Sequence, residues 1–353
     1  MNKKIIIEQI ISQNKLDAVL FYSFENRFWY SDFISTLGYL LITSKEAKLL
    51  VDGRYITEAK TTAKNVTVEN FTNIFQSLSD ICQKEQIINV GFEADYITYG
   101  QLQDWKQMLP KINFVPLNVR ELRMIKDQEE IKRIQKACEI GDLAYQDILK
   151  NVKSGMTERE LEAIILNSFS KNGATKASFE TIVASGLRSS MPHGKASDKV
   201  INDNEIITCD FGCVFQGFCS DMTRTFALGT IDPKLIEIHN IVREAQMNGI
   251  KAVKPGIKIG EIDKICRDYI TEKGYGEYFS HGTGHGLGIE IHEAPWVTKN
   301  EQTILKPGMV ITVEPGIYIP ELGGVRIEDD ILVTENSYQI LTQSPREIDI
   351  LKR

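Results

Sequence analysis

Apolar and polar positions alternate between helical and strand-like patterns through the first third of the chain. An amphipathic helix precedes a buried strand over 16–21, and apolar runs at 39–43 and 48–51 with a polar turn between them predict a hairpin. A further strand over 88–93 is followed by a helical stretch that ends at about Met108. Strands and helices mixed in this way predict a small α/β domain.

The pattern changes near residues 118–127, where a long helix is predicted to begin. Asp127 is followed three residues later by Glu130, which is the arrangement of a capping box. The apolar residues Ile131, Ile134 and Cys138 then recur at helical spacing. We therefore place a domain boundary at about residue 122, which gives domains over 1–122 and 123–353.

The second domain contains an internal repeat. The segment 152–156 recurs as 253–257, and 206–212 recurs as 310–316, in the same order and at nearly the same offset. A period this long is unsuited to a solenoid. The repeat instead predicts two copies of a half-domain that face each other across a pseudo-two-fold axis, with a cleft between them as the natural site.

Each copy carries two acidic residues on neighbouring strands. A tight turn would place Asp210 directly opposite Asp221. A loop centred on residue 321 would place Glu314 opposite Glu328 in the same way. Opposed like charges destabilise a sheet, so a cation is expected between them. Four carboxylates balance two divalent ions, and the sequence therefore predicts a two-metal centre.

Histidines accompany these acids in glycine-rich surroundings. His193 precedes a glycine, and His281 and His285 enclose a Gly-Thr-Gly segment. His292 lies in the stretch 289–295, whose alternation predicts a strand. Glycine-flanked backbone suits close approach rather than core packing, so these histidines are candidates for the site.

Other features have plainer explanations. His239 is predicted to be an ordinary helical residue, and Cys209, Cys213 and Cys219 are assigned to packing, because alternation directs Cys209 away from the face of Asp210. The glycine-rich stretch 282–288 lacks the Lys-Ser/Thr ending of a phosphate-binding loop.

Composition narrows the function classes. The 353 residues include 41 basic and 48 acidic side chains, a formal charge of −7, which gives no basic footprint for nucleic acid. No apolar run approaches the roughly 20 residues that a membrane span requires. The six cysteines form no CxxC pair, so we expect reduced thiols and a cytoplasmic protein.

These residues, in this order, resemble the pita-bread metallopeptidases, a family that includes methionine aminopeptidases, aminopeptidase P and prolidase. The resemblance covers about 123–353 and is carried by Pro192-His193, Asp210, Asp221, His285, His292-Glu293, Glu314-Pro315-Gly316, Arg326 and Glu328. The first domain, including 49–55, resembles the creatinase-type domain of aminopeptidase P and prolidase. The resemblance implies an α/β (α+β) fold, with a creatinase-like domain before a pita-bread catalytic domain, and a homodimer.

The resemblance also implies five metal ligands: Asp210, Asp221, His285, Glu314 and Glu328. Asp221 and Glu328 would bridge two ions, while the others would complete their shells. In the family the ligand lies seven residues before the catalytic histidine, which selects His285 and leaves His281 in the substrate site. Carboxylate-rich shells suit hard ions, so Mn²⁺ is expected first, with Co²⁺ or Zn²⁺ next.

The activity implied is that of an exopeptidase for peptides with proline in second position. A hydroxide bridging the two ions would attack the first carbonyl, and Glu314 would take and return the proton. His193 and His292 would hydrogen-bond the carbonyl oxygen and the leaving nitrogen. Phe179, with Ile291 behind it, is the candidate apolar wall for the proline ring.

The length of the substrate is the least determined property. A dipeptidase must bind the free carboxylate of its substrate with a fixed cation. After 292–295 the sequence has Trp296, and apart from Arg326 no basic residue nearby stands out for this role. Arg326 is either an ion-pair partner on the face of Glu328 or a substrate-orienting group. We therefore favour an Xaa-Pro aminopeptidase, with an Xaa-Pro dipeptidase as the alternative.

Three further alternatives keep the fold but not the peptidase chemistry. They are a metal-free binding protein, creatinase chemistry and a metal-stabilised structural domain. The first two lack some of the five ligands, which this chain retains. Structural sites are closed shells rich in Cys or His, whereas histidines beyond the ligands indicate an open site here.

Overall fold

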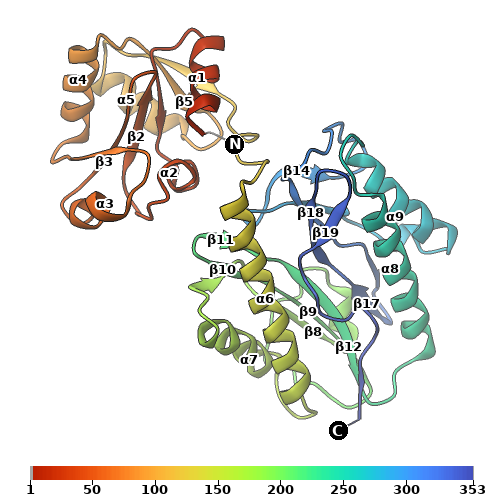
Figure 1. The fold of residues 1–353 in the computed structure, drawn as a ribbon. Coiled ribbons are helices and arrows are strands. Elements are labelled where there is room, and N and C mark those ends of the chain that lie inside the picture. The colour runs from red at the N-terminus through yellow and green to blue at the C-terminus, as the bar shows by residue number, and fades with distance from the viewer. Residues whose placement is uncertain (1–2, 353) are drawn as a thin grey trace. The chain divides into compact units, whose positions relative to one another are not determined.

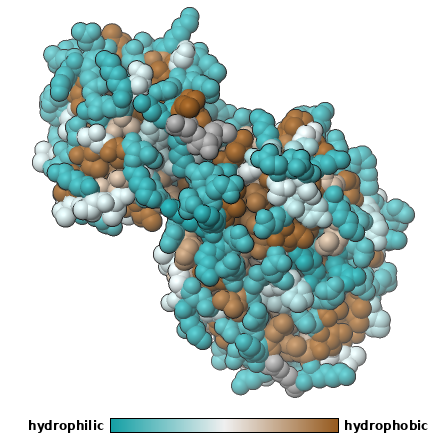
Figure 2. Space-filling model, viewed as in Figure 1, coloured by the Kyte–Doolittle hydropathy of each residue, from teal (hydrophilic) through white to brown (hydrophobic). Residues whose placement is uncertain are grey.

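The structure, a computed structural model, describes residues 3–352 and separates into two compact units, Met1–Leu122 and Arg123–Arg353. Each unit has its own hydrophobic core. The face shown in Figure 2 is mostly hydrophilic, with smaller hydrophobic areas between. None of the helices between residues 3 and 352 combines the length and apolar character needed to cross a bilayer.

The first unit is built on one six-stranded sheet. Its elements are α1 (Lys3–Gln13), β1 (Ala18–Phe21), α2 (Phe24–Ser31), β2 (Tyr39–Thr43), β3 (Ala47–Val51), α3 (Ile56–Thr62), β4 (Thr67–Asn70), α4 (Ile74–Glu85), β5 (Asn89–Glu93), α5 (Tyr99–Met108) and β6 (Asn113–Leu117). The strand order is β4-β3-β2-β1-β5-β6. The predicted hairpin is confirmed as β2 and β3, in which Tyr39 lies opposite Leu50.

Two helix pairs frame the second unit. They are α6 (Gln128–Asn151) with α7 (Glu158–Lys171), and α8 (Pro233–Ala252) with α9 (Gly260–Glu272). The predicted capping box of α6 is present: Asp127 accepts from the Glu130 backbone N–H, and the Glu130 side chain accepts from that of Asp127. Ile131, Ile134 and Cys138 are buried, as their helical spacing predicts.

The strands of the second unit form several short sheets between these helices. They are β7 (Lys176–Ala177), β8 (Ile182–Ser185), β9 (Glu205–Phe211), β10 (Cys213–Phe215), β11 (Phe218–Cys219), β12 (Met222–Leu228), β13 (Gly284–Gly286), β14 (Glu293–Val297), β15 (Val310–Val313), β16 (Gly316–Ile319), β17 (Gly323–Arg326), β18 (Asp329–Val333), β19 (Tyr338–Ile340) and β20 (Ile350–Leu351). Two short 3-10 helices, η1 (Gly186–Ser190) and η2 (Gly276–Tyr278), complete the fold.

The internal repeat is confirmed by the strand topology. β9 pairs antiparallel with β8 and β12, and β15 pairs antiparallel with β13 and β18. The turns that follow α6 and α8 each place a glycine, Gly155 and Gly256, at a φ of 89°. Figure 1 shows the two helix pairs on the outer sides of the strands.

The register expected for Asp210 and Asp221 is wrong by two residues. Asp210 lies opposite Thr223, and Asp221 directly precedes β12. The reason is that β9 does not turn straight into β12: β10 and β11 form a hairpin in a separate sheet with β7. A shift of two residues preserves the face of a strand, so both acids still point to one side.

The register expected for Glu314 and Glu328 is confirmed. Val313 lies opposite Asp329 and Gly316 opposite Arg326, so the two ladders share one register. In that register Glu314 lies opposite Glu328, between the β15–β18 pair and the β16–β17 pair.

The strand predicted over 289–295 is wrong in its first half. Residues 288–292 form a bend, and β14 begins at Glu293. The carbonyl of Gly288 accepts from the backbone N–H of Cys219 at 2.7 Å, and the N–H of Gly288 donates to the carbonyl of Glu290 at 3.0 Å. Because these backbone groups do not form the hydrogen bonds of a β-sheet, the apolar–polar alternation at the start of 289–295 does not correspond to a strand.

All six cysteines are free and buried. Cys209 and Cys213 belong to the core under α6 and α7, which agrees with the packing role predicted for them. His239 is a buried residue of α8.

Candidate metal centre

The five proposed ligands come from equivalent ends of the central strands in the two halves. Asp210 is in β9 and Asp221 directly precedes β12, whereas His285 is in β13, Glu314 follows β15 and Glu328 directly precedes β18. The duplicated fold therefore directs residues that are far apart in sequence towards one place.

Three of these side chains form a compact group. One ligand atom each from Asp221, His285 and Glu328 lies within 4.8 Å of the others, and all three residues are buried. Nε2 of His285 is 3.6 Å from Oδ2 of Asp221 and 3.4 Å from Oε1 of Glu314. Such spacing brings a nitrogen and carboxylate oxygens around a space that an ion can occupy.

Several buried oxygens here have no hydrogen-bond partner within residues 3–352. They include Oδ1 of Asp210, Oδ1 of Asp221 and Oε1 of Glu328. Thr223 donates to the other oxygen of Glu328 at 2.7 Å, so only one of the two is satisfied. Leaving a buried polar atom unpaired costs free energy, and a bound cation would satisfy all three oxygens. The residues present therefore fit divalent metal ions.

The orientation of His285 also suits a metal ligand. Its Nδ1 lies 3.0 Å from the carbonyl of Gly286, and because a carbonyl only accepts, Nδ1 carries the proton. This leaves Nε2 unprotonated towards the carboxylates, as in metal-ligating histidines. Burial lowers the pKa of His285 to about 3, which keeps the ring neutral.

His281 is engaged differently, which supports the choice made from spacing. Its Nδ1 is 2.7 Å from the carbonyl of Gly282, and its Nε2 is 2.8 Å from the hydroxyl of Tyr318. Burial lowers the pKa of His281 to about 4, so the neutral ring accepts from Tyr318. With both nitrogens occupied, His281 is not available as a ligand in this arrangement.

Arg326 is held within the second unit by three contacts. Its guanidinium donates to Oδ2 of Asp210 at 2.7 Å, to the hydroxyl of Tyr318 at 2.8 Å and to Thr223 at 3.1 Å. Of the two roles open for Arg326, these contacts support the ion pair, and its partner is Asp210.

The crowded carboxylates repel one another. Burial, followed by the charges of neighbouring carboxylates, raises the pKa values of Asp221 and Glu328 well above their ordinary range. Burial also raises the pKa of Glu314 to about 7. Without cations, the site therefore retains protons that isolated carboxyl groups would lose.

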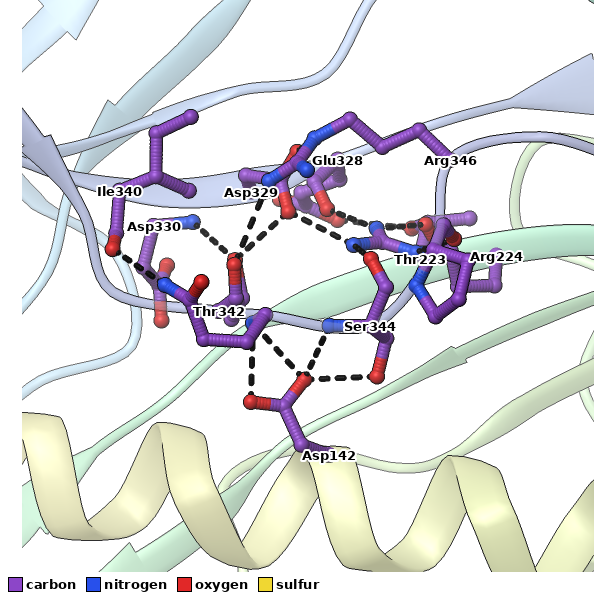
Figure 3. A network of polar contacts seen from close by, with 12 residues as sticks. Asp142, Thr223, Arg224, Glu328, Asp329, Asp330, Ile340, Thr342, Ser344 and Arg346 are labelled. Carbon is purple, nitrogen blue, oxygen red and sulfur yellow. Dashed lines mark hydrogen bonds and ion pairs between the residues drawn. The ribbon is translucent and has the colours of Figure 1, made fainter.

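A polar network behind the site holds the backbone of two proposed ligands, and Figure 3 shows the part of it around Glu328. Arg224 donates to the carbonyl of Glu328 at 2.6 Å and to the carboxylate of Asp329 at 2.7 Å. Oδ2 of Asp330 accepts from the backbone N–H of Asp221 at 2.9 Å. The network therefore fixes where Asp221 and Glu328 project.

These groups line a cavity of about 490 Å³. Of the site residues predicted from sequence, the cavity lining includes Phe179, His193, Asp210, Asp221, His281, His285, His292, Glu314, Arg326 and Glu328. Ile291, whose placement the structure also describes, is outside that lining. The bend at 288–292 explains the difference, because alternation no longer fixes which way Ile291 points.

Sequence reasoning did not assign Glu180, Lys195, Trp296 and Thr298, which also line the cavity. Trp296 is 45% exposed and stacks on His292 with ring centroids 6.5 Å apart. Its position four residues after His292 was a signal that could have been used. For Lys195, the one signal in the sequence was its position two residues after His193.

A buried ionic cluster fastens the bend that carries His292. Glu293 accepts from Nζ of Lys126 at 2.7 Å and from Nε of Arg123 at 3.4 Å. Arg123 also pairs with Glu290 at the other side of the bend. The two cations hold both flanks of His292, which fixes its place at the cavity.

Comparison with known families and proteins agrees with this geometry. A family model described as "Metallopeptidase family M24" matches residues 132–335, and one described as "Creatinase/Prolidase N-terminal domain" matches residues 7–125. These matches confirm the family and the fold class predicted from the sequence.

Individual relatives are similar over the whole chain. The Xaa-Pro dipeptidase of Pyrococcus horikoshii is 42% identical over 354 residues, which is 99% of each chain. The structure of an Xaa-Pro dipeptidase from Bacillus anthracis superposes with a TM-score of 0.96, at 43% identity over 99% of both chains. That of an X-Pro aminopeptidase from Thermotoga maritima gives 0.92, at 34% identity over 98% of this chain and 100% of the other.

Proposed function

This chain belongs to metallopeptidase family M24, and we propose that it is an Xaa-Pro exopeptidase, which hydrolyses the bond between a first residue and a following proline. The observation that carries the proposal is the group formed by Asp221, His285 and Glu328, whose buried carboxylates keep unpaired oxygens beside a cavity. The substrate class comes from the relatives, which are named as Xaa-Pro peptidases of both kinds.

Two divalent ions would be held by Asp210, Asp221, His285, Glu314 and Glu328. The donor set is mostly carboxylate oxygen with one imidazole nitrogen, which suits hard ions. We propose Mn²⁺ first, with Co²⁺ or Zn²⁺ as further candidates. Bound divalent ions supply Lewis-acid activation of water and of the scissile carbonyl.

The protein's own groups would handle protons and orient the peptide. Glu314 borders the cavity and accepts from Thr312 at 3.2 Å, which steadies a carboxylate that takes and returns a proton. His193 and His292 are exposed side chains in the cavity lining. We assign them to hydrogen bonds with the carbonyl oxygen and the leaving nitrogen.

Phe179 and Trp296 would form the apolar wall for the proline ring. Both line the cavity, whereas Ile291 does not. An aromatic face offers a large apolar contact surface at low entropic cost. Trp296 therefore replaces Ile291 in the assignment, and Phe179 is kept.

The length of the substrate needs a second candidate. The preference for an aminopeptidase depended on Arg326 being the basic residue at hand, and Arg326 is already paired with Asp210. Lys195 also lines the cavity, however, so a second basic residue is at hand for the free carboxylate of a dipeptide. This observation favours the Xaa-Pro dipeptidase over the aminopeptidase that the sequence suggested.

A homodimer and a cytoplasmic location complete the proposal. The six free, buried thiols support a reducing compartment, and the homodimer follows the resemblance to the family. Light scattering during size-exclusion chromatography measures the mass of the assembly directly.

The enzymatic test is a panel of Gly-Pro, Gly-Pro-Gly and an amino-blocked Gly-Pro, each with Mn²⁺-loaded protein. We expect release of glycine from Gly-Pro, little or none from Gly-Pro-Gly, and none from the blocked peptide; equal release from Gly-Pro-Gly would restore the aminopeptidase. Absence of turnover on every unblocked peptide would contradict the proposal.

A further inference from the structure

An exposed ion pair lies at the cavity and has no part in the metal site or in the proton transfers described above. Lys195 and Glu180 pair with each other, and their side chains are 62% and 60% exposed. The backbone of Lys195 bridges to Ile182, and its N–H donates to the carbonyl of His193 at 2.9 Å. The lysine therefore follows a proposed substrate-binding histidine by two residues on an anchored backbone.

Lys195 differs from the other basic residue of the cavity lining in its exposure and in its partners. Among the described residues that line it, the Lys and Arg residues are Lys195 and Arg326. Arg326 is buried, and its guanidinium already donates to three partners including Asp210. The ammonium of Lys195 sits instead on a long flexible stem, paired with a single exposed carboxylate. It is the cation in this lining that can turn towards a ligand.

We propose that Lys195 binds the free carboxylate of an Xaa-Pro dipeptide, which displaces Glu180 from the ammonium. This inference rests on the proposed function and names the substrate class within it. An exposed ion pair contributes little to stability, so exchange of one carboxylate for another is easy. A charge-assisted hydrogen bond then rewards a substrate that ends at proline. A longer peptide presents a neutral amide at that place and gains no such bond.

The test compares Gly-Pro with Gly-Pro amide, which differ only in the charge that Lys195 would bind. For Lys195→Gln we expect KM for Gly-Pro to rise roughly tenfold, the effect of one lost hydrogen bond to a charged group. KM for the amide should change far less. Lys195→Arg should restore Gly-Pro binding, and Glu180→Gln should lower KM for Gly-Pro by removing the competing carboxylate.

Two controls separate this inference from the proposed function. Lys254→Gln removes an exposed lysine outside the cavity lining and should leave both KM values unchanged. Inhibition by free proline should weaken in Lys195→Gln, whereas inhibition by prolinamide should not. Equal effects on the acid and the amide, or no effect on either, would overturn the role of Lys195 while the enzyme remained an Xaa-Pro peptidase. A wild-type protein that cleaves neither substrate would overturn both.

Discussion

Arg326 and Asp210 form a buried ion pair that joins the two halves of the second unit. Nη2 of Arg326, at the end of β17, donates to Oδ2 of Asp210 on β9 at 2.7 Å. The other oxygen of Asp210 has no hydrogen-bond partner among the described residues. The arginine therefore fixes the carboxylate through one oxygen and leaves the second for a cation.

Replacing the arginine should weaken metal binding more than it disturbs the fold of the loaded protein. In Arg326→Met, Asp210 loses its fixed orientation, and breaking a buried pair costs about 3–5 kcal/mol. We expect weaker Mn²⁺ affinity in calorimetry and a lower free energy of unfolding in urea for the metal-free protein. Arg326→Lys, which keeps the charge, should have a Mn²⁺ affinity between those of the wild-type protein and Arg326→Met. Unchanged Mn²⁺ affinity in Arg326→Met would contradict the role given to the Arg326–Asp210 pair.

The crowded carboxyl groups of the metal-free protein should contribute more stability as the pH falls. Burial raises the pKa of Glu314 to about 7 and those of Asp221 and Glu328 well above their ordinary range. Unfolded carboxyl groups titrate near 4. These carboxyl groups thus bind more protons in the folded than in the unfolded state between roughly pH 4 and pH 7, so their titration favours folding as the pH falls. His281 and His285, whose pKa values are lowered to about 4 and about 3, act in the opposite direction below about pH 6.5.

Urea unfolding of the metal-free protein at pH 8, 7, 6 and 5 measures this dependence. We expect the free energy of unfolding of the wild-type protein, minus that of a Glu328→Gln variant, to rise stepwise towards pH 5, because the histidine contributions cancel in this difference. Saturating Mn²⁺ should abolish the trend, because cations replace the protons. A difference that falls towards pH 5 would show that the carboxylates do not crowd one another.

Glu314→Gln should stop turnover without unfolding the protein. General acid–base catalysis typically contributes 10²–10⁴-fold, so we expect kcat to fall at least about a hundredfold. Glu321→Gln, in the exposed turn between β16 and β17, is the matched control and should keep full activity. Circular dichroism and Mn²⁺ stoichiometry establish that the fold and any bound ions remain, and a Gln variant with full kcat would remove Glu314 from its role.

Glu293→Gln tests whether the buried ionic cluster of Glu293, Lys126 and Arg123 positions His292. The substitution leaves the buried ammonium of Lys126 without its carboxylate, a change that destabilises by about 3–5 kcal/mol. We expect a lower thermal midpoint and a lower kcat with Mn²⁺ still bound. The double variant Lys126→Met/Glu293→Gln should recover stability but not kcat, and full recovery of both would make the cluster purely structural.

Trp296→Ala tests the apolar wall. The indole is 45% exposed and contacts His292, so its loss should spare the fold. We expect KM for Gly-Pro to rise several-fold, in line with the loss of one aromatic contact worth about 0.5–1.5 kcal/mol. Trp296→Phe should restore most of the affinity. An unchanged KM in the Ala variant would leave Phe179 as the candidate.

Local patterns predicted much of the fold. The capping box of Asp127 and Glu130 needs only residues within one turn, and the hairpin of β2 and β3 needs only two apolar runs and a turn. Glu314 and Glu328 were placed correctly because the ladders on either side of them share one register. The duplicated segments predicted the two halves because similar sequences fold in the same way.

The errors arose where distant segments decide the structure. The opposition of Asp210 and Asp221 failed because the intervening hairpin pairs with β7, which no local pattern reveals. The bend before β14 follows from bonds to Cys219 far earlier in the chain. The spacing of residues in the sequence could not predict that Lys195 lines the cavity, because this position depends on how distant segments fold together.

Carboxylates from both halves of the second unit converge at one place, and calorimetric titration of Mn²⁺ into the metal-free protein shows whether two divalent ions neutralise them. We expect uptake of two ions per chain, with at least one site lost in Glu328→Gln and in Asp221→Asn. No uptake by the wild-type protein, or uptake that neither substitution changes, would contradict this expectation.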